Sequence, residues 1–160
     1  MFNPHVPVRS HVVVRQPLPA PPERVFALFT TSTGLQSWFC DEAASDPVVN
    51  GEVHASWHDE DGEQWARVGR WVELTPPFVA VVEWYAVQTG SAAEEQPQAS
   101  DYWRIAIAPA DGASMVTVVS PILTSEVAMR AEVLSDAAKT GWEQTFSALR
   151  ALLIEQGDDQ

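Results

Sequence analysis

The sequence predicts an α+β fold in which an antiparallel sheet is covered by one long C-terminal helix. Segments with period-two alternation of apolar and polar residues fill the middle of the chain, and turn-forming Gly, Pro, Asn and Asp residues separate them. From Ser125 onward the apolar residues recur instead with helical spacing for about seven turns. An antiparallel sheet must bury one face, and only this last helix is long enough to cover it.

Composition limits the class of protein. A chain of 160 residues, 46% of them hydrophobic, fits one domain spanning 1–160 that buries a sizeable core. No apolar run approaches the ~20 residues that cross a bilayer, and the N-terminus lacks the apolar region and cleavage site of a signal peptide. A lone cysteine, Cys40, forms no internal disulfide and reads as a small apolar filler. We therefore expect a cytoplasmic protein.

The net charge excludes two classes of partner. The chain has nine Lys and Arg residues and 22 Asp and Glu residues, which gives a formal charge of −13. Nucleic acids and anionic membranes both require a basic surface that displaces their counterions. We expect neither nucleic acid nor membrane to be a partner.

The first segments predict a strand followed by two short helices. Residues 11–16 alternate and are rich in β-branched residues. Pro21 and Pro22 suit the first turn of a helix, and the residues after them form an apolar stripe with helical spacing. Gly34 is expected to end this helix. Residues 35–40 then predict a second helix, with Trp38 and Phe39 among its buried residues.

The middle of the chain predicts hairpin-connected strands. In residues 52–58, Val53, Ala55 and Trp57 share one face, and an Asp-Gly turn at 59–62 leads to a return strand at 63–74. Gly69 inside that strand predicts a bulge. After a turn at 75–77, the next strand places four apolar residues on one face: Phe78, Ala80, Val82 and Trp84.

The last segments predict a loop, two strands and the long helix. Residues 88–99 are polar and small, as in a hairpin loop. Trp103, Ile105 and Ile107 share one face of the following strand, and a turn at Asp111–Gly112 precedes the final strand. The helix is expected to be capped by Thr124 or Ser125 and to end before Gly157. Its apolar stripe includes Leu134, Trp142 and Phe146.

The sequence supplies few candidates for metal binding or catalysis. Glu52, His54 and His58 share a strand face, but that face is opposite Val53 and Trp57 and is expected to point to water. A metal site also needs a third convergent ligand with supporting contacts, so we predict no metal and no cofactor. No nucleophile elbow, HExxH sequence or phosphate-binding loop is present, and no catalytic residue is assigned. The facing of Arg67 and Glu73 stays open because of the expected bulge, and Glu83 is expected to point outward.

Several segments resemble one known family. APPERVF with Trp38, Asn50–Gly51, Gly69, ELTPPFVAVVEW and Gly141–Trp142 occur in the order and spacing of the activator of heat-shock-protein ATPase homologue family, within the START-like superfamily. The resemblance covers about residues 11–155. It implies a helix-grip fold, in which a curved antiparallel sheet grips the C-terminal helix and leaves a cavity. Asn50 replaces the first glycine of the usual pair, which is tolerable because Asn also adopts positive φ.

The resemblance makes ligand binding in that cavity the first functional hypothesis, with a small apolar or amphipathic molecule as partner. The lining is expected to comprise Trp38, Phe39, Val53, Trp57, Val82, Trp84, Trp103, Ile105, Leu134, Trp142 and Phe146. Two alternatives stay open: a protein-interaction module that acts on a chaperone or another protein, and an enzyme for a small cyclic or polyketide-like substrate. Chaperone activation is not transferred, because only about ten residues precede the first strand, whereas eukaryotic members carry an additional N-terminal domain. The chain is expected to be a monomer or a homodimer.

Overall fold

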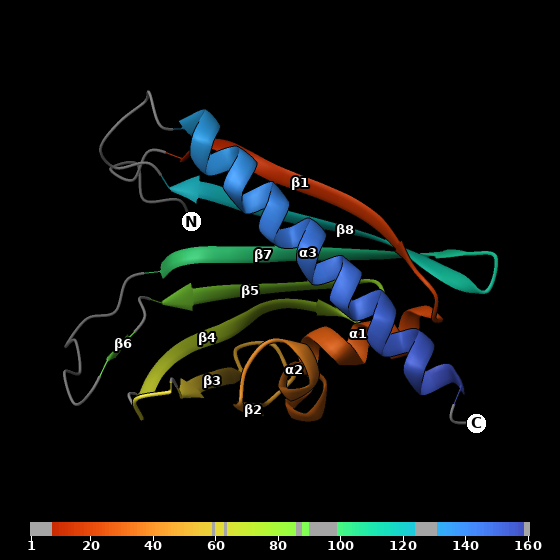
Figure 1. Cartoon of the computed structure of the whole chain (residues 1–160), viewed down its shortest axis with the longest axis horizontal. Coiled ribbons are helices and arrows are strands. Elements are labelled where there is room, and N and C mark those ends of the chain that lie inside the picture. The colour runs from red at the N-terminus through yellow and green to blue at the C-terminus, as the bar shows by residue number, and fades with distance from the viewer. Residues whose placement is uncertain are drawn as a thin grey trace.

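A computed structural model describes residues 8–58, 60–62, 64–85, 88–89, 99–123 and 131–158 of the chain. Its elements follow the predicted order of a strand, two short helices, a run of strands and a long helix (Figure 1). They are β1 (Val8–Leu18), α1 (Pro22–Thr30), α2 (Ser32–Trp38), β2 (Glu42–Ser45), β3 (Glu52–His58), β4 (Gln64–Thr75), β5 (Val79–Tyr85), β6 (Gln88–Thr89), β7 (Ala99–Ala110), β8 (Ala113–Leu123) and α3 (Ala131–Asp158). The predicted α+β class with a helix-grip arrangement is confirmed.

The strands form one antiparallel sheet with the order β1-β8-β7-β5-β4-β3-β2, and the short β6 pairs with β4. The helix α3 crosses one face of this sheet diagonally, from β1 toward α1 and α2 at the other end (Figure 1). Two hydrogen bonds hold it there: the Arg150 guanidinium donates to Gln16 of β1 at 3.2 Å, and Arg24 of α1 donates to Gln156 at 2.8 Å.

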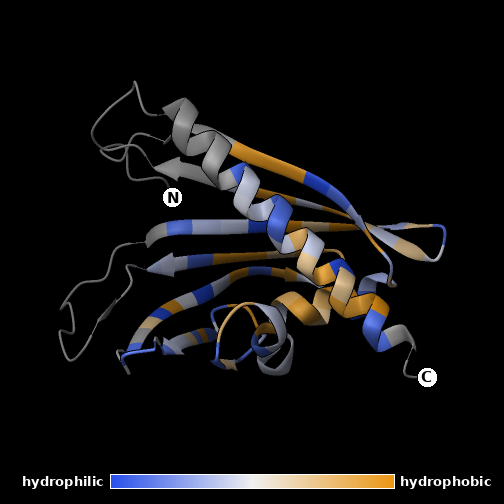
Figure 2. Ribbon diagram, in the orientation of Figure 1, coloured by the Kyte–Doolittle hydropathy of each residue, from blue (hydrophilic) through white to orange (hydrophobic). Residues whose placement is uncertain are grey.

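The core lies between the gripping face of the sheet and the helices. Apolar residues concentrate on α1 and along the C-terminal half of α3 (Figure 2). Phe146, Leu149 and Leu153 of α3 are almost completely buried, as are Val25 and Phe29 of α1. The spacing of these residues by three or four positions places them on one side of each helix, as the sequence predicts. Hydrophobic burial therefore fixes both helices against the sheet.

The break between α1 and α2 corrects one expectation. The chain leaves helical geometry at Thr31, whose φ of −96° and ψ of 157° are extended, and not at Gly34, which lies inside α2. The Thr31 hydroxyl caps α2 by accepting a hydrogen bond from the Gly34 amide at 2.9 Å. Gly34 is needed for packing, since a Cβ there would collide with the Ala27 carbonyl oxygen of α1. The strand β2, which pairs with β3, was not predicted.

The course of β4 corrects a second expectation. Gly69 pairs regularly with Val53 of β3 and Trp84 of β5, and the register shift lies between Trp71 and Glu73 instead. The missing side chain at Gly69 makes room for Trp84, because a Cβ would lie 2.8 Å from Cε3 of that indole. The glycine thus serves close packing and not the predicted bulge.

Other turn residues behave partly as expected. Asn50 has a positive φ of 69°, as expected for its place before Gly51. Phe78, in contrast, belongs to the turn before β5 and is 46% exposed, so its expected place on the apolar face is wrong. Gly157 lies within α3 and not beyond its end. The predicted helix caps Thr124 and Ser125 and most of the predicted loop 88–99 lie outside the described residues.

Candidate functional site

A cluster of aromatic rings occupies the space between the sheet and α3. Its centre is Trp103 of β7, whose ring centroid lies 5.1 Å from that of Trp84 on β5 and 5.3 Å from that of Trp142 on α3. Phe39 and Trp38, at the end of α2, lie 4.9 and 6.1 Å from the same ring. Most of these pairs are tilted or edge-to-face, which is the favoured geometry for aromatic contacts. Three separate elements therefore converge on one tryptophan.

Hydrogen bonds fix the orientation of the outer indoles. The Trp38 Nε1–H donates to the Leu28 carbonyl of α1 at 2.8 Å, and the Trp57 Nε1–H donates to the Phe39 carbonyl at 2.7 Å. Each indole thus satisfies its single polar group and directs its apolar surface into the cluster. These two bonds also tie the end of α2 to α1 and β3.

Burial divides the predicted lining residues into two groups. Five have no exposed surface: Val53, Val82, Trp84, Ile105 and Phe146. Trp103 is 5% exposed, whereas four others are only partly buried against the core: Trp38, Phe39, Trp57 and Trp142. The side chain of Leu134 lies outside the described residues. Sequence reasoning thus identified residues that the fold brings together on one face.

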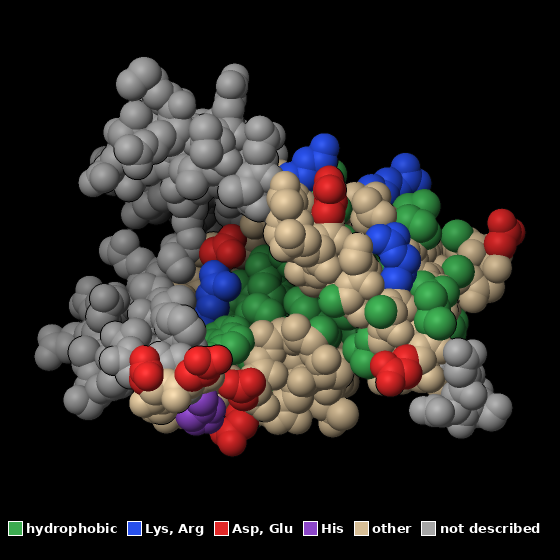
Figure 3. Space-filling view, in the orientation of Figure 1, with side chains coloured by type: hydrophobic (Ala, Val, Ile, Leu, Met, Phe, Trp, Pro, Cys, Tyr) green, Lys and Arg blue, Asp and Glu red, His purple; other side chains and the backbone are tan. Residues whose placement is uncertain are grey.

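The molecular surface is hollowed on this face. Figure 3 shows hydrophobic side chains at the bottom of a hollow beside α3, with acidic and basic side chains along one border. Trp38, Phe39, Trp57 and Trp142, which pack against the core, keep part of their surface exposed.

A charged pair, Arg67 and Asp101, lies on the same side of the sheet. Arg67 pairs in register with the buried Ala55, and Asp101 with the buried Trp84, so both side chains share the gripping face. Arg67 Nη2 lies 3.0 Å from Asp101 Oδ2, and the two side chains are 18% and 24% exposed. The guanidinium carbon lies 5.0 Å from the Trp84 ring centroid, within the range of a cation–π contact.

Asp101 is held by three donors and still has a perturbed pKa. Besides Arg67, it accepts a hydrogen bond from the Tyr102 amide at 2.8 Å and one from the Ser120 hydroxyl at 3.3 Å. Burial raises the pKa of Asp101 above its usual value, and this outweighs the lowering by Arg67 and by the hydrogen bonds. Carboxyl groups with a raised pKa beside a charged partner occur at functional sites and in structural ion-pair networks alike.

Sequence reasoning missed this pair. Asp101 precedes Trp103 by two positions in one strand, so their shared facing was readable from the sequence. Arg67 alternates in phase with Trp71 and therefore shares its face. This could not be predicted, because a bulge was wrongly expected at Gly69 between the two residues. The enzyme hypothesis requires an ionisable side chain on the gripping face; these two residues meet that requirement without assigning a reaction.

The histidines considered for metal binding have separate partners. His54 Nε2 lies 3.0 Å from Glu52 Oε2, whereas His58 lies near Asp41, with its Nδ1 3.8 Å from Oδ2. Within the described parts of the chain, no three His, Cys, Asp or Glu residues are grouped as metal ligands. The described helices likewise include none that is long and apolar enough to span a membrane.

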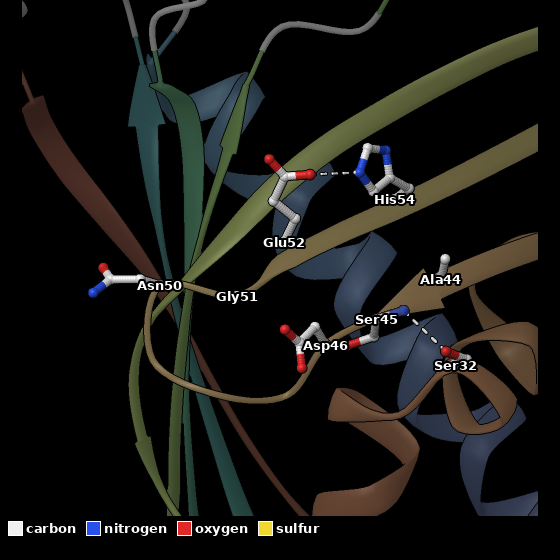
Figure 4. A pocket seen from close by; sticks show the side chains of 8 residues that line it. All are labelled: Ser32, Ala44, Ser45, Asp46, Asn50, Gly51, Glu52 and His54. Carbon is white, nitrogen blue, oxygen red and sulfur yellow. Dashed lines mark hydrogen bonds and ion pairs between the residues drawn. The ribbon is translucent and has the colours of Figure 1, made fainter.

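His54 and Glu52 border an open polar pocket of about 520 Å³ near β2 (Figure 4). The hydroxyls in it already hold the local fold together. The Ser45 amide donates to Ser32 Oγ at 2.9 Å, and the Ser45 hydroxyl donates to the Thr30 carbonyl at 2.6 Å. Trp71 Nε1 also donates to Ser45 Oγ at 3.1 Å. The two serines of this pocket are thus engaged in local hydrogen bonds, and we take the aromatic cluster with its charged pair as the candidate site.

Comparison with solved structures finds the same fold in several bacterial proteins. A protein of Rhodobacter sphaeroides is 19% identical, with a TM-score of 0.72 over 91% of this chain and 93% of that one. A protein of Nitrosomonas europaea is 16% identical, with a TM-score of 0.70 over 98% and 99%. The Aha1 dimer from Colwellia psychrerythraea is 15% identical, with a TM-score of 0.63 over 88% and 93%. At these identities the likeness extends to the fold alone.

Comparison with curated proteins gives no significant match. Residues 19–154 match the family described as Activator of Hsp90 ATPase homolog 1-like protein. That range includes both short helices, every strand after the first and most of α3, together with the aromatic cluster and the charged pair. The chain therefore belongs to the Activator of Hsp90 ATPase homolog 1-like protein family.

Proposed function

We propose that this chain is a cytoplasmic module that binds a small apolar or amphipathic molecule between the gripping face of the sheet and α3. The observation that carries the proposal is the partial exposure of the aromatic residues around Trp103. Ligand sites are concave, mostly apolar and rich in aromatic side chains, with a few polar groups that orient the ligand. The cluster supplies the first features, and the Arg67–Asp101 pair supplies the last.

The packing of α3 supports entry at this place. Along α3, Phe146, Leu149 and Leu153 are fully buried, whereas Trp142, one turn earlier, is only partly buried. The helix is thus packed firmly at its C-terminal end and less closely at Trp142. A guest that inserts beside Trp142 would bury aromatic surface that water now contacts, at about 25 cal/mol per Å².

A dye titration tests the proposal. Nile red, an uncharged dye whose emission increases in apolar surroundings, is titrated against wild type, Trp142→Leu and Phe78→Leu. The Trp142→Leu variant lacks the indole that would contact the aromatic dye, a contact worth about 0.5–1.5 kcal/mol, so it should bind the dye roughly 2- to 10-fold more weakly. Phe78 is an exposed aromatic residue in a turn away from the cluster, so its variant should bind as wild type does.

Two outcomes would contradict the proposal. One is the absence of binding by Nile red, an uncharged aromatic hydrocarbon and a long-chain alcohol alike. The other is equal weakening by both substitutions, which would locate the dye elsewhere. Circular dichroism of each variant verifies that it is folded before it is titrated.

A protein-interaction role is the second candidate, and the family description and the dimeric relative favour it. In that case the partner, either a chaperone or a second copy of this chain, would bind an outer surface. A pull-down with a chaperone, and sedimentation of the protein alone, should then give the same result for Trp142→Leu as for wild type. Loss of the interaction in Trp142→Leu would instead connect partner binding to the aromatic cluster.

A further inference from the structure

We propose that Arg67 and Asp101 select ligands that present an uncharged hydrogen-bond acceptor, such as a carbonyl or phenol oxygen, beside their apolar body. This inference rests on the proposed function, because it specifies the chemistry of the ligand at the same site. Its basis is the placement of the charged pair next to the aromatic cluster. Arg67 lies against Trp84, and Trp84 is in ring contact with the central Trp103.

Burying the Arg67–Asp101 pair costs desolvation free energy, and an apolar pair at the same positions would avoid that cost. Transferring two charges from water into a protein interior is expensive, and a buried ion pair is often no more stabilising than apolar residues of the same volume. Among the described residues, those around Arg67 and Asp101 on this face are apolar or neutral: Ala55 opposite Arg67, Trp84 opposite Asp101, Trp103 two positions along β7, and Ser120, which donates to Asp101. A polar pair in such surroundings is typical of groups that orient a ligand.

Arg67 has hydrogen-bonding capacity to spare. A guanidinium carries five N–H donors, and the hydrogen bond to Asp101 uses Nη2. Its Nε–H is buried and has no hydrogen-bond acceptor among the described residues. The side chain is 18% exposed, so an incoming oxygen can approach it, and a small shift of this side chain would bring the buried Nε–H within reach of that oxygen. Pairing such a donor recovers free energy that an unsatisfied buried group loses.

The electrostatics favour an uncharged acceptor over a carboxylate. Asp101 already neutralises Arg67 at 3.0 Å, so a second anion at this place would meet the carboxylate without a free positive charge to balance it. Burial also raises the pKa of Asp101, which shows that the surroundings disfavour one negative charge, let alone two. The whole chain, with a net charge of −13, adds to this repulsion.

Three naphthalenes of similar shape separate these contributions: 2-ethylnaphthalene, 2-acetylnaphthalene and 2-naphthoate. Their dissociation constants are measured by equilibrium dialysis at pH 7.5. For wild type we expect the ketone to bind about tenfold more tightly than the hydrocarbon, as a hydrogen bond to a charged donor provides. The carboxylate should bind more weakly than the ketone.

Three variants assign the effect to the pair. Arg67→Met keeps the length of the side chain but removes the donors, so the advantage of the ketone over the hydrocarbon should disappear. Asp101→Asn leaves the Arg67 charge uncompensated, so 2-naphthoate should gain about tenfold relative to the ketone. Arg70→Met is the matched control, since Arg70 pairs with Glu83 at 3.4 Å on the opposite face and should change none of the ratios.

The outcomes distinguish this inference from the proposed function. If 2-ethylnaphthalene binds but the ketone has no advantage, or if Arg67→Met retains that advantage, the selection is refuted while binding of apolar molecules stands. If no naphthalene binds, both proposals fail. If circular dichroism shows that Arg67→Met is unfolded, the Asp101→Asn variant becomes the test. The inference is then overturned if 2-naphthoate does not gain affinity relative to the ketone in that variant.

Discussion

Substituting Gly69 by alanine tests the packing that positions the aromatic cluster. The added Cβ would lie 2.8 Å from Cε3 of Trp84, 2.9 Å from the Glu83 carbonyl oxygen and 3.0 Å from Cγ1 of Val53. Ordinary contacts begin near 3.4 Å, so the strands β3 and β5 must move by several tenths of an ångström or the indole must tilt. Trp84 has no exposed surface, and its ring centroid lies 5.1 Å from that of Trp103, so a tilt would alter this aromatic contact.

The magnitude follows from two opposing contributions. Overpacking a tight core costs about 1–3 kcal/mol. Replacing glycine by alanine in a regular element returns roughly 0.5–1 kcal/mol through the smaller entropy of the unfolded chain. We therefore expect Gly69→Ala to lower the free energy of unfolding by about 1–2 kcal/mol.

Urea denaturation at 25 °C, followed by far-ultraviolet circular dichroism, measures this change. Gly141→Ala is the matched control, because Gly141 lies inside α3 with no atom near the place of its missing Cβ. That variant should be more stable than wild type by up to about 1 kcal/mol. If Gly69→Ala were as stable as Gly141→Ala, the close approach of β4 to Trp84 would be refuted.

Three further predictions concern the core, the charged pair and the cysteine. Leu149→Ala removes a fully buried side chain and should lower the free energy of unfolding by about 2–5 kcal/mol. Ile154→Ala, at a 56% exposed position, should change that free energy by less than about 0.5 kcal/mol. Equal effects of the two substitutions in denaturation would contradict the orientation of α3. Because burial raises the pKa of Asp101 above 3.8, the folded protein binds this proton more tightly than the unfolded chain, so this contribution to stability is largest below pH 3.8 and declines as pH rises through the raised pKa. Unfolding of wild type relative to Asp101→Asn should show that decline with pH, and a relative gain would reverse the assigned cause. Burial likewise raises the pKa of the Cys40 thiol, so Ellman's reagent should modify it at least about tenfold more slowly in the folded protein than in urea, and equal rates would show it to be accessible.

Much of the fold was predictable because local patterns and global burial agree. Alternation in β3, β5 and β7 correctly places Val53, Val82 and Ile105 on the buried face. The helical spacing of Phe146 and Leu149 likewise gives the side of α3 that contacts the sheet. The apolar residues of each element recur with its structural period, so only one orientation of that element buries all of them.

The errors arise where a residue serves a distant contact. Gly34 and Gly69 read as a helix break and a bulge, yet each is small because a neighbouring element approaches it: α1 in one case and Trp84 in the other. The turn of Pro76, Pro77 and Phe78 ends one strand and delays the next, which moves Phe78 off the apolar face. Nothing in the local sequence reports such tertiary approaches.

The candidate site shows the same division. Its aromatic members were readable, since Trp84 and Trp103 alternate in phase with buried neighbours. The Arg67–Asp101 contact joins β4 to β7, 34 positions apart in the chain, and depends on the register of the intervening β5. A sequence shows that such residues exist but not that they meet.

We propose above that a small molecule binds to the aromatic surface around Trp103. Two-dimensional NMR of the tryptophan indole N–H groups during titration with 2-acetylnaphthalene tests it most directly. We expect the signals of Trp38, Trp103 and Trp142 to shift together and to saturate with one dissociation constant, while that of Trp71, hydrogen-bonded to Ser45, stays in place. Unchanged signals from the three cluster tryptophans, or a shift confined to Trp71, would contradict it.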